Sequence, residues 1–162
     1  MSLNRRRQGR YTSTNLSITE TEVLQAAEDI LRRRYERGVT LTNPGACGDY
    51  LRMRLAGLQH EEFHIVWLDQ RQRVICTEKL FNGTIDGSSV HPREVVRAAL
   101  KHNAAAAILA HNHPSGVAEP SVADQSITTE LKQILGSVGC RVLDHFVIGS
   151  GHPTSFAARG WL

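Results

Sequence analysis

The stretch ILAHNHPSGVAEPSVAD, residues 108–124, decides the fold and carries the candidate chemistry. An apolar run ends at His111, and His113 follows two residues later. Alternate residues of a strand point to the same side, so both imidazoles can face one point if the strand geometry continues. A Pro-Ser-Gly run then breaks the strand, and Ser121-x-x-Asp124 predicts the start of a helix. The first turn of that helix can turn the Asp124 carboxylate toward the two histidines.

These residue types are those of an open zinc site. Two imidazoles, one carboxylate and a water are a common ligand set of catalytic zinc, so the sequence predicts His111, His113 and Asp124 as metal ligands. Each also has a plainer interpretation. A histidine pair at a strand end is often a polar loop edge, and Ser121 and Asp124 also fit an N-cap and a carboxylate near the positive end of a helix dipole. A polar cluster directly after AAAAILA favours the metal site.

The combination resembles a known signature. His111-Asn112-His113-Pro114, Ser121 and Asp124 resemble the JAMM (MPN+) metallohydrolase motif. The longer stretch HPREVVRAALKHNAAAAILAHNHPSG, with RVLDHFVIG and the closing SFAARGWL, resembles the catalytic-type domain of the bacterial RadC family over roughly residues 40 to 162. This resemblance implies a JAMM/MPN-type, cytidine-deaminase-like layered α/β domain that binds Zn²⁺. Residues 1–40 show no match to the DNA-binding-like segment that precedes this domain in full-length RadC relatives.

A hydrolytic zinc centre needs a base for the metal-bound water, and a carboxylate can take that role. Glu61 and Glu62 open a predicted strand and are the candidates. The Glu-x-Phe context of the family implies Glu61 as general base, whereas a solvated strand-end pair is the structural alternative. The resemblance also implies that Ser121 supports the oxyanion of the tetrahedral intermediate through its hydroxyl group.

Composition and charge place the chain among ordinary globular proteins. Hydrophobic residues make up 41% and charged residues 22% of 162 residues, which suits one domain with a sizeable core. The net charge is +3, but four of the 19 basic side chains are Arg5, Arg6, Arg7 and Arg10, so residues 11–162 net about −1. We therefore expect no basic nucleic-acid platform on the domain, and a weak, salt-sensitive contact at most through the arginine tail.

The sequence also bears on the cellular compartment. Cys47, Cys76 and Cys140 are too scattered for a disulfide framework or a cysteine zinc cluster, and the P-C-x-x-C pair of the zinc deaminases is absent. No apolar run approaches the ~20 residues of a membrane span. We expect a cytoplasmic protein with no membrane contact, of uncertain oligomeric state.

The order of the predicted elements completes the fold. Residues 1–16 predict a disordered basic tail, residues 17–40 one helix that starts at a capping box formed by Ser17 and Glu20, and residues 41–162 the main domain. Apolar periodicity predicts a helix after Asn43-Pro44, strands at 61–69, 73–80, 105–111 and 142–148, helices from 91 and 121, and a final strand at 155–161. We predict a mixed sheet flanked by helices, in which strands 61–69 and 73–80 form a hairpin.

The expected function is that of a zinc-dependent JAMM-type metallopeptidase or isopeptidase-like hydrolase. The alternative is a metal-binding accessory protein associated with DNA repair, without catalysis of its own, and a third candidate is a DNA-binding module that uses the arginine tail. Asp144-His145 is a second polar pair in an apolar strand. The sequence leaves open whether the pair supports the site from behind, lines a groove, or is a satisfied strand-edge pair.

Overall fold

The computed structural model describes residues 4–5, 11–12, 19–35, 43–83 and 90–162. Its elements, in chain order, are β1 (Asn4–Arg5), β2 (Tyr11–Thr12), α1 (Glu20–Tyr35), α2 (Pro44–Leu55), β3 (Glu62–Leu68), β4 (Val74–Asn82), α3 (Pro92–Lys101), β5 (Ala106–Asn112), α4 (Val122–Ser137), β6 (Arg141–Ile148) and β7 (Thr154–Ser155).

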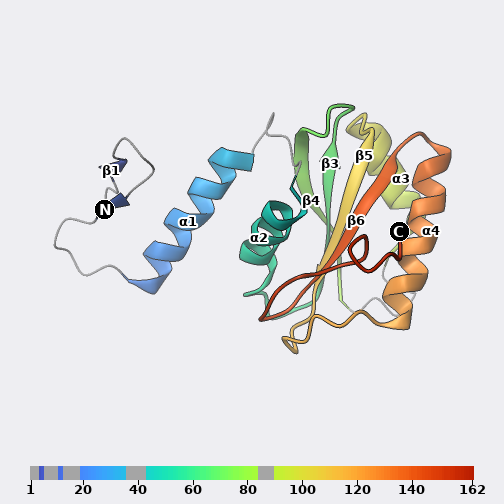
Figure 1. Cartoon of the computed structure of the whole chain (residues 1–162). Helices are drawn as coiled ribbons and strands as arrows, with labels where there is room; N and C mark the ends of the chain where they lie inside the picture. Colours follow the sequence, from blue (N-terminus) through green and yellow to red (C-terminus); the bar gives the residue numbers. More distant parts are fainter. Residues whose placement is uncertain (1–3, 6–10, 13–18, 36–42, 84–89) are drawn as a thin grey trace.

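A five-stranded mixed sheet in the order β4-β3-β5-β6-β7 forms the centre of the molecule. β5 and β6 run parallel, and the other neighbouring pairs are antiparallel. α2 covers one face, while α3 and α4 cover the other (Figure 1). The predicted α/β layered fold with a mixed sheet and a β3–β4 hairpin is confirmed.

Two apolar clusters lie between the sheet and the helices that cover it, one on each face of the sheet. On the α3/α4 side, Phe63, Trp67 and Leu109 of the strands pack against Val95 and Leu131 of the helices. On the α2 side, a second cluster joins the helix to the opposite face of the same strands. Because the central strands are covered on both sides, β5 is buried along its whole length, which explains its continuous apolar sequence.

Capping residues set the starts of two N-terminal helices. Asn43 caps α2 as predicted, and its side-chain oxygen accepts a hydrogen bond from the Gly45 N–H at 2.9 Å. The capping box of α1 is formed by Thr19 and Glu22: the Thr19 hydroxyl oxygen accepts from the Glu22 N–H, and the Glu22 carboxylate accepts from the Thr19 N–H. The box predicted at Ser17 and Glu20 is therefore wrong by two residues, and Ser17 itself lies outside the described residues.

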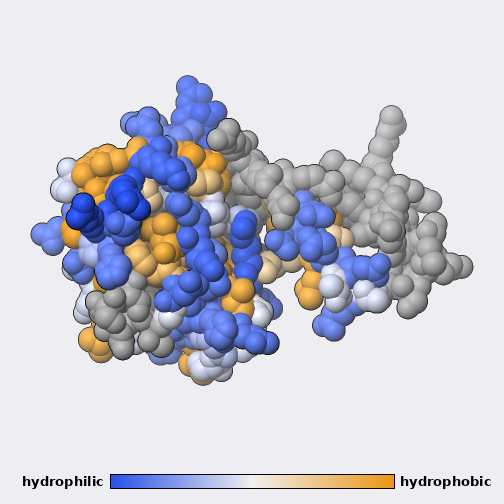
Figure 2. All heavy atoms as spheres, turned by 180° about the vertical axis from the view of Figure 1, so that it is seen from behind, coloured by the Kyte–Doolittle hydropathy of each residue, from blue (hydrophilic) through white to orange (hydrophobic). Residues whose placement is uncertain are grey.

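α1 lies on the far side of α2 from the sheet (Figure 1). Its Leu31 packs against the α2-side cluster, whereas Val23 and Leu24 near its other end are exposed. Seen from behind, the surface of the domain is largely hydrophilic with smaller hydrophobic areas between (Figure 2). Of the arginine tail, the backbone of Arg5 belongs to β1, and Arg6, Arg7 and Arg10 lie outside the described residues, as does most of the predicted disordered segment.

Two further expectations concern the end of the chain and the membrane. The predicted strand at 155–161 is much shorter, because β7 contains only Thr154–Ser155 and turns follow it. Among the helices in the described ranges, none has the length and apolar character needed to cross a membrane. The predicted cytoplasmic location and the domain boundaries stay predictions.

The loop after β5 lies directly against the end of β6. Gly116, at a φ of 84°, accepts a hydrogen bond through its carbonyl oxygen from the Ser150 N–H at 2.9 Å. A Cβ atom on Gly149 would lie 2.3 Å from that same carbonyl oxygen. Gly149 therefore permits an approach of two backbones that no other residue allows, and this approach holds the loop that follows His113.

We expect Gly149→Ala to lower the free energy of unfolding by about 1–3 kcal/mol, since the added methyl group overpacks this contact. Gly151→Ala is the matched control, because a Cβ atom there meets nothing within 4 Å, and it should change stability by less than about 0.5 kcal/mol. Urea unfolding followed by tryptophan fluorescence measures both. Equal stabilities of the two variants would contradict the close approach.

Candidate metal centre

His111 is placed by the central strand of the sheet. Residues 107, 109 and 111 of β5 share the face that packs under α3 and α4, so His111 continues an apolar row. Its Cα partner on β3 is Phe63, and the two rings stack with centroids 6.4 Å apart. The His111 side chain is completely buried. A fully buried imidazole at the end of an apolar row requires polar partners.

His113 and Asp124 approach from the two ends of the following loop. The His113 N–H donates to the Ile148 carbonyl oxygen at 2.8 Å, which extends the β5–β6 ladder beyond the last assigned residue of β5. His113 therefore keeps the same side as His111, as the H-x-H spacing predicts. Asp124 lies in the first turn of α4, and its side chain is almost completely buried.

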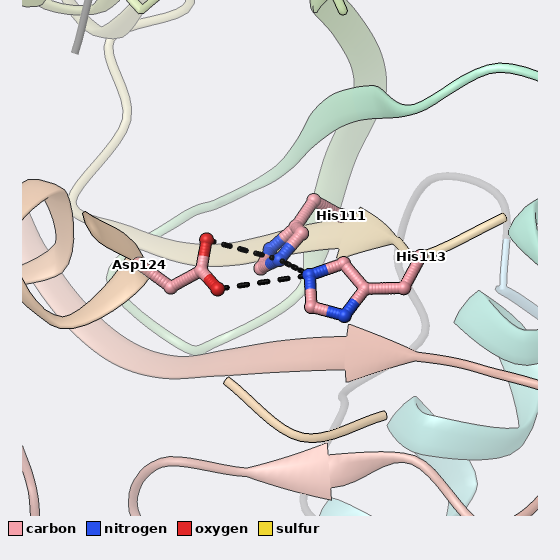
Figure 3. Close-up of side chains that lie close together, drawn as sticks. All are labelled: His111, His113 and Asp124. Carbon is pink, nitrogen blue, oxygen red and sulfur yellow. Dashed lines mark hydrogen bonds and ion pairs between the residues drawn. The ribbon is translucent and has the colours of Figure 1, made fainter. Parts of the chain in front are cut away.

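The structure brings the three predicted ligands together (Figure 3). The Nε2 atoms of His111 and His113 are 3.0 Å apart. The Asp124 carboxylate lies 3.2 Å from His111 Nε2 through Oδ1 and 3.6 Å from His113 Nε2 through Oδ2. Two donor atoms that bind one zinc ion tetrahedrally at ~2.0–2.1 Å are about 3.4 Å from each other. The two separations from His111 Nε2, 3.0 and 3.2 Å, lie close to that value. One ligand atom from each of the three residues lies within 4.8 Å of the others, so the group can hold a metal ion.

The other ring nitrogens of both histidines have hydrogen-bond partners outside the site. His113 Nδ1 donates to the Val117 carbonyl oxygen at 2.9 Å, because a carbonyl can only accept. His111 Nδ1 pairs with His145 Nε2 at 2.8 Å. Both Nδ1 atoms thus have partners outside the site, while the two Nε2 atoms and a carboxylate face one point. Such an arrangement favours a cation between them, either a proton or a metal ion.

The pKa values of Asp124 and His113 also favour a cation at this point. Burial alone would raise the pKa of Asp124, but the interactions with His111 and His113 outweigh it and hold the pKa far below its usual value. The Asp124 carboxylate raises the pKa of His113, and the charge of Glu61 acts in the same direction against partial burial. Asp124 is thus a permanent carboxylate, which is the form that binds a metal.

Ser121 is the N-cap of α4 and forms a complete capping box with Asp124. The Ser121 oxygen accepts from the Asp124 N–H at 3.1 Å, and its hydroxyl group donates to Asp124 Oδ2 at 2.7 Å. The backbone N–H of Ser121 donates to the same Oδ2. These bonds occupy Oδ2 and leave Oδ1 as the freer oxygen toward His111. In this structure Ser121 holds the carboxylate, and its one hydroxyl proton points to Asp124.

The two glutamates at the start of β3 differ in position. Glu62 pairs with His64 at 2.8 Å and Lys79 at 3.3 Å. Glu61 precedes β3 by one residue, and its charge reaches His113. Since adjacent residues of an extended chain point to opposite sides and Phe63 is the partner of His111, Glu61 is the glutamate on the side of the histidines. Its role as a base stays a prediction.

Asn112 holds the segment that carries Glu61, a role that the sequence analysis missed. Its Oδ1 accepts from the Glu62 N–H at 2.8 Å, and its Nδ2 donates to the His60 carbonyl oxygen at 2.9 Å. The Glu61 carbonyl oxygen accepts from the Gly83 N–H at 2.8 Å on the other side. The buried asparagine between the two histidines thus replaces a pair of ladder hydrogen bonds. Its position inside the H-x-H motif was the available signal.

His145 is the second residue without an assigned role in the sequence analysis. It is fully buried on β6, beside β5, and it contacts His111 directly. Burial lowers its pKa well below the usual value, which favours the neutral ring. The interpretation as a satisfied strand-edge residue is wrong for His145. Asp144 points elsewhere, since its carboxylate accepts from the Ser155 hydroxyl group and the Ala157 N–H.

Comparison with known proteins identifies the family. A family model described as the RadC-like JAB domain matches residues 41–161. The chain belongs to this family. A UPF0758 protein of Vibrio cholerae serotype O1 is 56% identical over 140 residues, which cover 86% of this chain and 62% of the relative. A UPF0758 protein of Nitrosococcus oceani is 54% identical over 151 residues, which cover 91% of this chain and 67% of the relative. The predicted RadC resemblance is confirmed.

A third relative of the same family, a UPF0758 protein of Azotobacter vinelandii, is 52% identical over 140 residues, or 86% of this chain and 62% of the relative. The chain thus spans a little under two thirds of the length of the Vibrio and Azotobacter proteins. These names state no activity. The proposals below rest on the RadC-like JAB domain and on its group of two histidines and one aspartate.

We expect His113→Ala to abolish stoichiometric zinc binding while the fold survives. His113 lies beyond the end of β5 and is partly exposed, with 18% of its side-chain surface accessible, so its loss removes a ligand without opening the core. His152→Ala is the matched control, because His152 is exposed and belongs to no group of candidate ligands in the described residues. Metal analysis after gel filtration, with circular dichroism, checks both. One equivalent of zinc retained by His113→Ala would remove the site.

Proposed function

We propose that the protein is a zinc-dependent JAMM-type hydrolase that cleaves a peptide or isopeptide-like amide bond. The observation that carries the proposal is the convergence of two imidazole nitrogens and a buried carboxylate on one point, where they can hold a metal ion. When bound there, zinc supplies Lewis acidity toward a carbonyl oxygen and lowers the pKa of a bound water toward ~7. The donor set of two neutral imidazoles and one carboxylate fits zinc and leaves the centre net positive.

Glu61 is the proposed general base. It accepts a proton from the attacking water as the C–O bond forms and returns it to the leaving nitrogen as the C–N bond breaks, so that the products are a carboxylic acid and a neutral amine. Support comes from its position on the side of the histidines and from the backbone bonds to Asn112 and Gly83 on either side of it. These bonds hold the segment in place before any substrate arrives. A fixed base contributes more than a mobile one because its orientation costs no entropy in the reaction.

Ser121 has one supported role and one proposed role. As the N-cap, it holds Asp124 Oδ2, while Oδ1 faces His111. The oxyanion role requires its hydroxyl proton to turn from Asp124 to the substrate oxygen, and the backbone N–H of Ser121 would then keep Oδ2 in place. The proposed oxyanion contact therefore exchanges one of two hydrogen bonds to the same carboxylate oxygen.

The proposal names a class of substrate and no individual substrate. A protein-derived amide fits the reaction class, and an additional weak nucleic-acid contact through Arg5, Arg6, Arg7 and Arg10 would decrease as salt increases. A second candidate function is a metal-binding accessory protein in DNA repair, without catalysis. The Ser121 hydroxyl group favours this candidate, because its hydrogen bond to Asp124 accounts for the residue without a substrate.

Glu61→Gln separates the two functions. A general base contributes typically 10²–10⁴-fold to the rate, so turnover of an amide or isopeptide substrate found by screening should decrease by about that factor. Zinc content should remain at one equivalent, because Glu61 is not a ligand in this arrangement.

Glu62→Gln is the matched control, since Glu62 pairs with His64 and Lys79 rather than with the site, and its turnover should remain near that of the unmodified protein. A zinc-loaded protein without turnover of any amide tested would favour the accessory function. If Glu62→Gln loses activity while Glu61→Gln keeps it, then Glu62 is the base and the proposed assignment is wrong.

A further inference from the structure

We propose that Thr128 and His145 form a hydrogen-bond chain that keeps the Nε2 atom of His111 unprotonated and directed at the metal position. The inference rests on the metal site of the proposed function and assigns positioning residues behind it. Neither residue belongs to the predicted ligand set, and both are buried beneath the site. The chain runs from the backbone of α4, through β6, to the ligand on β5.

The direction of the chain follows from its first member. The Thr128 hydroxyl group donates to the Asp124 carbonyl oxygen at 2.5 Å, and a carbonyl oxygen can only accept. A hydroxyl group has one proton, so Thr128 Oγ1 must accept from its other partner, His145 Nδ1, at 2.5 Å. A neutral His145 with its proton on Nδ1 has a lone pair on Nε2. That lone pair accepts from His111 Nδ1 at 2.8 Å.

The last step determines the chemistry of the ligand. With its proton on Nδ1, His111 presents an unprotonated Nε2 to His113 and Asp124. If His145 carried its proton on Nε2 instead, it would donate to His111 Nδ1 and force the His111 proton onto Nε2. A protonated Nε2 cannot bind a metal. The tautomer of His145 thus decides whether His111 is a ligand.

Burial leaves only one of the two tautomers of His145 compatible with its hydrogen-bond partners. His111, His145 and Thr128 are each at most 2% exposed, so no bulk water can replace a missing partner. Every buried side-chain nitrogen or oxygen atom in the described residues has a hydrogen-bond partner, and reversal of the chain would leave the Asp124 carbonyl oxygen and the Thr128 hydroxyl group in conflict. Packing also orients the ring of His145, which lies between Phe63 and Phe156 with centroid distances of 5.7 and 4.7 Å.

The chain also couples two ligands to each other. It begins at the carbonyl group of Asp124 and ends at His111, while the carboxylate of the same Asp124 faces His111 Nε2. α4 and β5 are therefore connected both in front of and behind the metal position. Hydrogen-bond partners of this kind typically change metal affinity by ~10–100-fold when they are removed.

The test compares Thr128→Val with Thr128→Ser in the full-length chain. Valine keeps the shape and removes the hydroxyl group, so zinc affinity measured by competition with a chromophoric chelator should decrease by ~10–100-fold. Serine keeps the hydroxyl group and should restore an affinity close to that of the unmodified protein. Thr129→Val is the matched control: Thr129 makes the same kind of bond to the carbonyl group four residues earlier, but on the exposed side of α4. Its zinc affinity should not change.

The second readout is the tautomer itself. Two-bond ¹H–¹⁵N correlations of the zinc-free chain should place the proton of His145 on Nδ1 in the unmodified protein and in Thr128→Ser. Thr128→Val removes the hydroxyl oxygen that accepts from His145 Nδ1. The tautomer of His145 with its proton on Nε2 should therefore appear. If Thr128→Val does not fold, His145→Gln replaces it: its amide oxygen can accept from His111 Nδ1, so it should bind zinc more tightly than His145→Leu.

The outcomes separate this inference from the proposed function. An unmodified chain without stoichiometric zinc would remove the metal site, and the tautomer measurement would still test the chain. Zinc bound equally by the unmodified protein and by Thr128→Val, with His145 unchanged, would overturn the chain and leave the metal site standing. A weaker affinity in Thr128→Ser and Thr128→Val alike would assign Thr128 to packing alone and overturn its role as a hydrogen-bond partner.

Discussion

The parallel pairing of β5 with β6 is the constraint on which the rest of the structure depends. It places β5 in the middle of the sheet, with helices over both faces, and this position requires a continuous apolar sequence. The same ladder brings His145 beside His111 and extends past the end of β5 to His113 through the Ile148 carbonyl oxygen. A strand built for burial therefore ends in polar residues whose partners the neighbouring strand supplies.

The start of α4 provides the opposite half of the site. Its capping box holds the Asp124 carboxylate by two hydrogen bonds from Ser121, and the Asp124 N–H donates a third to the Ser121 hydroxyl oxygen. Local sequence therefore determines the orientation of the carboxylate before any metal is bound. The loop that separates it from His113 is held against β6 at Gly116 and Gly149. Local capping and long-range backbone contact together set the separation between carboxylate and imidazoles.

Behind these groups lies a polar network inside an apolar core. Its members are costly to bury unless each donor meets an acceptor, and the chain from the Asp124 carbonyl group through Thr128 and His145 to His111 satisfies them in one direction. The lone pairs that remain face one point between His111, His113 and Asp124. Because the buried groups satisfy one another's hydrogen bonds in this direction, the two Nε2 atoms and the carboxylate at the edge of the network remain to bind a cation.

The sequence by itself determined the elements and the ligand group. Periodicity predicted the four helices and the strands β3 to β6, whereas β1 and β2 lie in the segment predicted to be disordered and β7 is only two residues long because turns follow it. The H-x-H-x7-S-x2-D spacing brought together residues linked by strand and helix-turn geometry. Only the tertiary structure decided the roles of Asn112, Thr128 and His145. Apart from the Asp124 carbonyl group four residues before Thr128, their partners are 17 to 52 residues away in sequence. Spacing along one chain segment cannot predict contacts that depend on which strands become neighbours, because that choice is made by the packing of the whole sheet.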